Sequence, residues 1–247
     1  MLLDQLVTSL PFYFEKAFLP NGFCWASTDL QAIKSESKAF LHPEETVFLE
    51  TLKFPQPQLS YLIGRYCAKK SIIKYGYPIK PQEVLIRPGV WGQPIIFAPG
   101  ISNIAVSIAH SHKSGVAIAF PEAYPMGVDI EKIDLKNIYS LKTTLSSGEF
   151  CKLQKIYPKT EEILLATILW TLKEAVSKAL RCGLTVPFPI LETCEFKSIN
   201  NLLFCDFNHF PQYRGVAYVF NDSVISIAYP KQLLLEENRF RYLLENQ

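Results

Sequence analysis

The chain has 247 residues and a mass of 28.1 kDa, a length that suits one large domain or two small ones. Apolar residues make up 49% of the sequence and charged residues 19%, which excludes a disordered chain. A formal net charge of +2 gives no strongly basic surface, so we do not expect a nucleic-acid-binding protein.

The sequence also lacks the signals of export or membrane insertion. The strongest apolar stretch, Ile163–Trp170, is far shorter than the roughly 20 residues that cross a bilayer. No basic region precedes an apolar core at the N-terminus, so we expect no signal peptide. The six cysteines form no Cys-x-x-Cys motif, and the four histidines complete no zinc pattern with them. We therefore expect a cytoplasmic protein with reduced thiols and no membrane segment.

The first half is expected to combine helices with short strands after an irregular, aromatic-rich segment that runs up to Trp25. Apolar spacing predicts, in chain order, a helix within Pro43–Lys53, a helix at Leu59–Lys74, and strands at Val84–Arg87, Pro94–Phe97, Ile104–Ile108 and Val116–Phe120. The polar segment Ala109–Gly115 is expected to form the loop of the last strand pair.

The second half begins after a boundary at Pro121–Pro125. The pattern predicts, in chain order, a strand at Gly127–Ile133, helices around Ser147–Ile156 and Glu161–Arg181, and strands at Cys194–Phe196, Leu202–Cys205, Gly215–Phe220 and Val224–Tyr229. The last strand pair has the same form as the pair that ends the first half, although no repeat in the sequence itself is convincing. We therefore expect an α+β protein built as a pseudo-twofold pair of subdomains, 1–121 and 122–247, with the active site in the cleft between them.

The first candidate site is the pentapeptide Gly127-Val128-Asp129-Ile130-Glu131. In a strand, alternate side chains share a face, so Asp129 and Glu131 project together while their apolar neighbours enter the core. Two carboxylates on one face can converge on a hard cation such as Mg²⁺. An edge strand with a solvated acidic face is the alternative, and the pentapeptide alone does not decide between them.

The second candidate site is a helix around Trp170–Lys178. A helical projection places one group of side chains opposite the apolar residues, namely Trp170, Lys173, Glu174, Ser177, Lys178 and Arg181. A solvated helix would show the same periodicity, but a tryptophan among charged residues is unusual because a large aromatic ring gains most from being covered. The third candidate site is the turn that follows Ser107, where His110, Ser111 and His112 could donate hydrogen bonds to phosphate oxygens.

Taken together, the Gly-x-Asp-x-Glu motif, the later Trp-x-x-Lys-Glu-Ala-x-x-Lys motif and the earlier His-Ser turn resemble the 4′-phosphopantetheinyl transferase superfamily. The length resembles its two-halved, monomeric branch, the surfactin-synthetase and enterobactin type. Two weaker family motifs have counterparts in Gly64-Arg65-Tyr66-Cys67-Ala68-Lys69 and Gly92-Gln93-Pro94. The likeness covers Ser60–Gly183.

The resemblance implies a transferase that moves the 4′-phosphopantetheine arm of coenzyme A (CoA) to a serine of an acyl or peptidyl carrier protein. Adenosine 3′,5′-bisphosphate is released, and Mg²⁺ is the cofactor. The implied metal ligands are Asp129, Glu131 and Glu174, and the implied catalytic residues are Glu174 as the base and Lys178. The implied CoA-binding residues are Arg65, His110, Ser111, Lys173 and Lys178, with the phosphates met by subdomain 1–121 and the metal by subdomain 122–247.

The sequence departs from the family pattern at several CoA-binding positions. Ala109 stands where many members have serine, and Ser111 is expected to compensate. Gln93 stands where lysine is common, which removes a cation. Two other functions stay open from the residues alone: a Mg²⁺-dependent nucleotide pyrophosphate hydrolase, and a catalytically silent CoA-binding protein.

Overall fold

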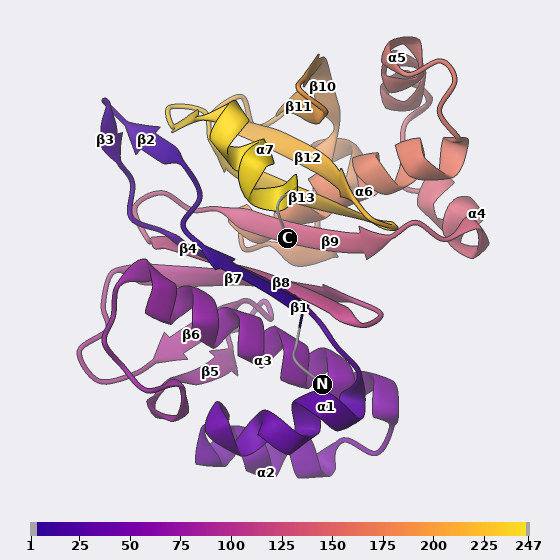
Figure 1. Ribbon diagram of the computed structural model, residues 1–247. Coiled ribbons are helices and arrows are strands. Elements are labelled where there is room, and N and C mark those ends of the chain that lie inside the picture. Colours follow the sequence, from indigo (N-terminus) through magenta and orange to yellow (C-terminus); the bar gives the residue numbers. More distant parts are fainter. Residues whose placement is uncertain (1–3, 246–247) are drawn as a thin grey trace.

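The computed structural model describes residues 4–245 of the chain. Two antiparallel β-sheets lie face to face, and each has one long helix on its outer side (Figure 1). The layers therefore follow the order helix, sheet, sheet, helix, which confirms the predicted α+β class with small antiparallel sheets. Within residues 4–245, no helix combines the length and apolarity needed to cross a bilayer.

The first sheet packs on helix α3, Pro55–Tyr75. Its strands lie in the spatial order β1 (Asp4–Thr8), β4 (Gly22–Ser27), β8 (Ser114–Pro121) and β7 (Ile104–Ser111), all antiparallel. Alternate residues of β4 face opposite sides, so Cys24 and Ala26 pack towards α3 while Phe23 and Trp25 enter the core between the sheets. Small side chains on the outer face let the helix approach the sheet closely.

The second sheet packs on helix α6, Glu162–Ala179. Its strands lie in the spatial order β10 (Thr193–Ile199), β11 (Leu202–Phe207), β12 (Tyr213–Phe220), β13 (Ser223–Pro230) and β9 (Gly127–Lys132), all antiparallel. In β13, Val224 and Ala228 face α6, whereas Ile225 and Ile227 enter the core that the two sheets share.

Each long helix crosses the start of one strand so closely that only glycine fits there. A Cβ atom added at Gly22 would lie 1.9 Å from the carbonyl oxygen of Ser71 in α3. A Cβ atom added at Gly127 would lie 1.9 Å from the carbonyl oxygen of Ala175 in α6. The two halves therefore repeat the same strand–helix contact, and at Gly127 this contact brings β9 against α6.

A matched pair of buried ion pairs also relates the two halves. Lys69 binds Glu45, and Lys173 binds Glu149, and the two partners are 24 positions apart in the sequence in both cases. Each glutamate is the third residue of a helix and completes its capping box, in α2 (Pro43–Thr51) and α5 (Ser147–Ile156) respectively. These matched contacts support the predicted pseudo-twofold architecture. In the sequence, the two halves correspond at a few polar positions and not along their whole length.

The two sheets meet along β7 and β9. The backbone N–H of Val128 donates to Ser107 Oγ at 3.0 Å, and the N–H of Lys132 donates to Ser111 Oγ at 3.1 Å. These hydroxyls satisfy backbone groups that β9 does not pair within its own sheet. The seam therefore fixes the end of β7 beside the strand that carries Asp129 and Glu131.

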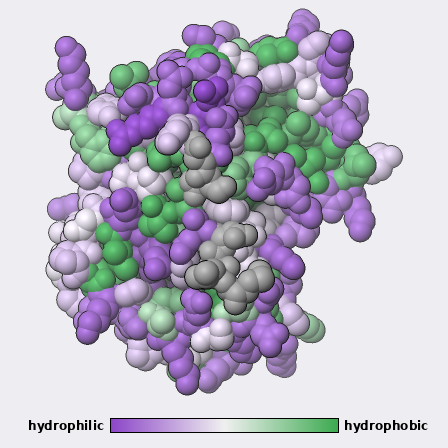
Figure 2. Space-filling view, viewed as in Figure 1, coloured by the Kyte–Doolittle hydropathy of each residue, from purple (hydrophilic) through white to green (hydrophobic). Residues whose placement is uncertain are grey.

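Shorter elements surround this frame. They are α1 (Leu30–Glu36) and the hairpin of β5 (Leu85–Pro88) and β6 (Pro94–Phe97) in the first half, and α4 (Ile138–Lys142) in the second. Strand β14 (Leu234–Leu235) pairs with β2 (Phe12–Phe14), which pairs with β3 (Ala17–Phe18), and α7 (Glu237–Glu245) follows. Figure 2 shows polar side chains over most of one face, with an apolar area where α6 and β12 lie in Figure 1.

The structure corrects two sequence-based expectations. The segment up to Trp25 is not irregular, because it contains β1 to β4 and supplies two strands of the first sheet. The segment Ala109–Gly115 is not a loop, because β7 and β8 stay paired up to Ser111 and Ser114. His112 adopts a φ of 52°, which allows a tight two-residue turn there, so His110 and Ser111 are strand residues.

Candidate active site

The candidate site is built where β9 passes α6. Val128 and Ile130 are fully buried in the core between the sheets, so Asp129 and Glu131 face the opposite side. Glu174 and Lys178 lie one helical turn apart on α6 and face the same region. The structure therefore brings together the four residues that the sequence placed at the centre of the site.

Asp129 is bound by the lysine of the helix. Lys178 Nζ donates to Asp129 Oδ1 at 2.6 Å, and Asp129 is only 4% exposed. Its second oxygen, Oδ2, is buried and has no hydrogen-bond partner among the described residues. Burial raises the pKa of the Asp129 carboxyl, and the charge of Lys178 acts in the opposite direction. A buried, unpartnered carboxylate oxygen is costly, so this atom is suited to receive a ligand.

Glu131 is held from both sides of the seam. Ser111 Oγ donates to Glu131 Oε2 at 2.9 Å, and the Trp170 side chain also forms a hydrogen bond with this carboxylate. Burial and the negative charge of Asp129 raise the pKa of Glu131. The tryptophan that is unusual among charged residues therefore has two partners, since its ring also packs 5.8 Å from the ring of Phe188.

The pKa of the third carboxyl, Glu174, is also raised. Burial, with the negative charges of Asp129 and Glu131, raises the pKa of Glu174 to about 7, while Lys178 opposes the increase. Because Asp129 raises the pKa of Glu131, and both raise the pKa of Glu174, the three carboxylates lie near one another in a partly desolvated space. A carboxyl that titrates near neutral pH is suited to accept a proton in a reaction.

The chemistry of this donor set fits a hard cation. Its ligands are all carboxylate oxygens, the type that Mg²⁺ prefers, and Asp129 Oδ2 is buried without a partner. Within residues 4–245, however, no three acidic, histidine or cysteine side chains are arranged as an ion-binding cluster. In this arrangement the ammonium group of Lys178 neutralises Asp129.

The structure corrects the role expected of Lys173. Its side chain is only 1% exposed, and Nζ donates to Glu149 Oε2 at 2.8 Å and to the Thr144 carbonyl at 3.1 Å. Lys173 is therefore a structural residue and does not reach the space beside Glu174. The helical projection gave its angle correctly, but it could not show that the start of α5 covers this side of α6.

Ser111 also differs from the expectation. Its hydroxyl has one proton, which it donates to Glu131, and its oxygen accepts the N–H of Lys132. It therefore has no free donor for a phosphate and does not replace the serine that Ala109 lacks. Ser111 positions Glu131 instead.

Arg65 and His110 line a large cavity between α2, α3 and the β5–β6 hairpin, with a volume of about 540 Å³. Arg65 Nε lies 3.2 Å from Glu45 Oε1, its NH2 donates to the Ile86 carbonyl at 3.2 Å, and its guanidinium lies over the Tyr61 ring. Desolvation and the charge of Lys178 lower the pKa of His110.

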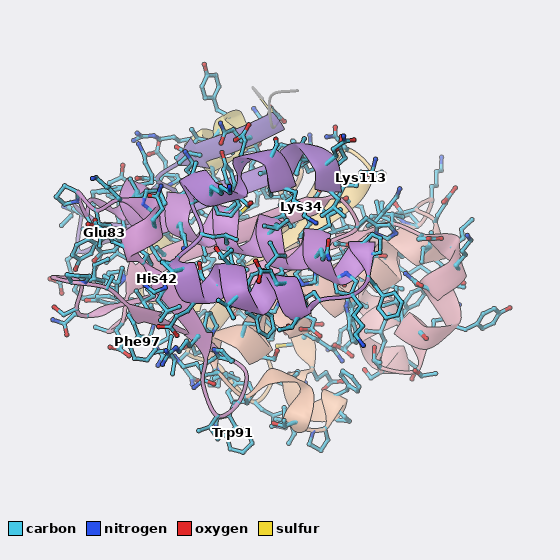
Figure 3. The ribbon with its side chains drawn as sticks, turned by 90° about the horizontal axis from the view of Figure 1, so that it is seen from below. Lys34, His42, Glu83, Trp91, Phe97 and Lys113 are labelled. Carbon is cyan, nitrogen blue, oxygen red and sulfur yellow. The ribbon has the colours of Figure 1, made fainter. Side chains whose placement is uncertain are left out.

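A second cavity of about 200 Å³ connects this region with the carboxylates. Glu174 and Lys178 line it, and it shares Gly92, Pro94 and Ile108 with the larger cavity. Trp91, at the tip of the β5–β6 hairpin (Figure 3), also lines the smaller cavity although it is 63% exposed. Sequence analysis missed Trp91, whose position beside the Gly92-Gln93-Pro94 motif was the available signal.

Residues 125–228 match the family model of the 4′-phosphopantetheinyl transferase superfamily. This range contains the three carboxylates and Lys178, and it leaves out Arg65 and His110. No curated protein sequence matches the chain.

Similar solved structures include holo-acyl-carrier-protein synthases from three organisms. The Bacillus anthracis structure, a complex with CoA, is 20% identical, with 42% of this chain and 95% of that chain covered and a TM-score of 0.37. The Neisseria meningitidis structure is 22% identical, with coverages of 41% and 96% and a TM-score of 0.35. The Plasmodium yoelii structure is 18% identical, with coverages of 44% and 95% and a TM-score of 0.35.

Proposed function

We propose, because residues 125–228 match the family model of the 4′-phosphopantetheinyl transferase superfamily, that this protein is a phosphopantetheinyl transferase that modifies an acyl or peptidyl carrier protein. The donor is CoA, and the acceptor is a serine hydroxyl of the carrier. The serine oxygen forms a bond to the phosphorus that bears the pantetheine arm, and the bond from this phosphorus to the bridging oxygen breaks. The products are the holo-carrier protein and adenosine 3′,5′-bisphosphate.

The observation that supports this proposal is the convergence of three carboxylates and one lysine beside a cavity at the seam of the sheets. Asp129, Glu131 and Glu174 are the residues that would hold Mg²⁺. When bound, the cation would neutralise the pyrophosphate and polarise the phosphorus under attack. Without a cation, each pair of like charges near 4 Å would cost about 4 kcal/mol at an effective dielectric constant of 20.

Glu174 is proposed as the acceptor of the serine proton, directly or through a water molecule. Without a cation the pKa of Glu174 is raised to about 7, and a bound Mg²⁺ would lower it and so favour the carboxylate form that can accept a proton. In the site without a cation, burial and the negative charges of Asp129 and Glu131 are what raise the pKa of Glu174.

Lys178 is proposed to bind the pyrophosphate and to stabilise the charge that develops on the leaving phosphate. Its side chain is 26% exposed and lines the smaller cavity while its ammonium group contacts Asp129. His110, which lines the adjoining cavity, is proposed to contact a CoA phosphate as a hydrogen-bonding group.

The test is mass spectrometry of several apo-carrier proteins, both acyl and peptidyl, after incubation with CoA and Mg²⁺. We expect at least one carrier to gain the mass of phosphopantetheine, and we expect its Ser→Ala variant to remain unmodified. Release of nucleotide from CoA without any carrier would instead indicate a pyrophosphate hydrolase. Failure to modify any carrier under these conditions would reject the proposed function.

A further inference from the structure

The inference concerns the larger cavity, which adjoins the candidate active site through Gly92, Pro94 and Ile108. Under the proposed function, the phosphorus that bears the pantetheine arm lies beside Glu174 and Lys178, where the serine of a carrier protein must reach it. The nucleotide end is then free to enter the larger cavity. Its wall contains the aromatic pair Phe48 and Tyr61, whose ring centroids lie 5.0 Å apart and which offer apolar surface to a purine.

The cations of this cavity are already balanced by carboxylates. Arg65 pairs with the buried Glu45, donates to a backbone carbonyl and lies over a tyrosine ring, and its side chain is only 16% exposed. Arg87 forms an ion pair with Glu44, and both side chains are about half exposed. The four charged lining residues therefore carry no net charge. Figure 3 views the molecule from the side of this helix-and-hairpin region, with His42 and Phe97 labelled near it.

His110 is the remaining titratable group that could add positive charge among the described lining residues. Desolvation and the charge of Lys178 lower the pKa of His110 and so disfavour its positively charged form in this cavity. A terminal phosphate monoester carries between one and two negative charges at this pH. The cavity thus offers such a phosphate no excess positive charge, and Glu44 would repel it.

We infer that this enzyme does not select for the 3′-phosphate of CoA and accepts 3′-dephospho-CoA as a comparable phosphopantetheine donor. This inference rests on the proposed function. The same bonds form and break as with CoA. The serine oxygen bonds to the phosphorus of the arm, the bond from this phosphorus to the bridging oxygen breaks, and the serine proton passes to Glu174. The leaving group is then AMP instead of adenosine 3′,5′-bisphosphate.

The first experiment measures kcat/KM for both donors with the same apo-carrier protein, with the released AMP or adenosine 3′,5′-bisphosphate quantified by chromatography. A charge-assisted contact to a phosphate oxygen is worth about tenfold or more. We therefore expect the two values to agree within tenfold. A preference for CoA of more than tenfold would overturn the inference while leaving the proposed transfer intact.

Calorimetric titration of the enzyme with CoA and with 3′-dephospho-CoA, both with Mg²⁺, provides a readout that needs no carrier protein. Affinities that agree within tenfold support the inference, and tighter binding of CoA by more than tenfold overturns it. Loss of transfer from both donors, together with similar binding of both, would reject the proposed function and with it the donor role of 3′-dephospho-CoA, whereas a preference for CoA in an enzyme that transfers would reject the inference alone. Failure of both compounds to bind would reject both.

Two charge variants on helix α2 test whether the balanced charges of the cavity are the reason that the 3′-phosphate is not selected. Glu44→Gln removes the partner of Arg87, so we expect the ratio of CoA to dephospho-CoA efficiency to rise at least fivefold. Glu50→Gln removes the same charge from an exposed position on α2 that does not line the cavity, and it should leave the ratio unchanged. An unchanged ratio in Glu44→Gln, or an equal rise in both variants, would overturn the inference.

Discussion

The substitution Lys173→Met separates a structural role of this lysine from a role in CoA binding. Lys173 is the ion-pair partner of Glu149, and both side chains are only 1% exposed. After the substitution, Glu149 keeps the N–H groups of Ser146 and Thr193 and the Thr193 hydroxyl, but its charge loses the ammonium group. Removing one partner of a buried ion pair typically costs about 3–5 kcal/mol of unfolding free energy.

The matched variant in the first half is Lys69→Met. It leaves Glu45 with the Arg65 guanidinium at 3.2 Å, so the loss of stability should be about 1.5–3 kcal/mol smaller than for Lys173→Met. Urea unfolding followed by circular dichroism gives both values. For Lys173→Met we also expect the melting temperature to fall on the order of 10 °C.

Two further measurements decide whether this reasoning holds. Glu149→Gln in the Lys173→Met background should recover part of the lost stability, because it removes the unpaired charge. The KM for CoA, measured well below the melting temperature, should stay near the wild-type value in Lys173→Met. Wild-type stability combined with a large increase in KM would show that Lys173 contacts CoA and would refute the structural assignment.

Three other outcomes are expected for the proposed transferase. Glu174→Gln should lower kcat by at least about 10²-fold, whereas Lys178→Ala should reduce both CoA affinity and turnover; near-wild-type kinetics in both would contradict the site. EDTA should abolish transfer and Mg²⁺ or Mn²⁺ should restore it, because the donors are oxygen atoms, and full activity in the chelator would exclude the three-carboxylate metal site. Calibrated gel filtration should give a monomer, since one chain supplies both sides of the seam, and an obligate trimer would contradict this.

The local pattern of the sequence predicted the elements of the site because strands and helices have fixed periods. Period-two alternation in β9 separated Asp129 and Glu131 from the core, and the period of 3.6 in α6 aligned Glu174 with Lys178. The predicted role of Lys173 in CoA binding was wrong because the angle of a residue on a helix does not show which other element covers that side of the helix. Its partner Glu149 belongs to another helix, and nothing in the period of α6 points to it.

Sequence analysis predicted the two-halved architecture from the form of the strand pairs, but it found no convincing repeat in the residues themselves. The features that the two halves share are a few polar contacts and two glycines, Gly22 and Gly127, spread among apolar residues that can replace one another in a core. The hairpin turn was misplaced because Ala109–Gly115 is rich in small and polar residues, which are common in loops. Its backbone nevertheless continues the ladder, as His110 pairs with Gly115.

The pairing of β14 with β2 has a consequence for how the protein is made. Phe12 of β2 and Leu235 of β14 lie in one buried cluster, which also contains Phe240 and Leu244 of α7. During synthesis, β2 leaves the ribosome long before β14 and α7 are translated, so the apolar residues that they cover stay unshielded until then. Contacts between residues so distant in sequence slow folding. We therefore expect the need for chaperones to be greatest while only the first half of the chain has been synthesised.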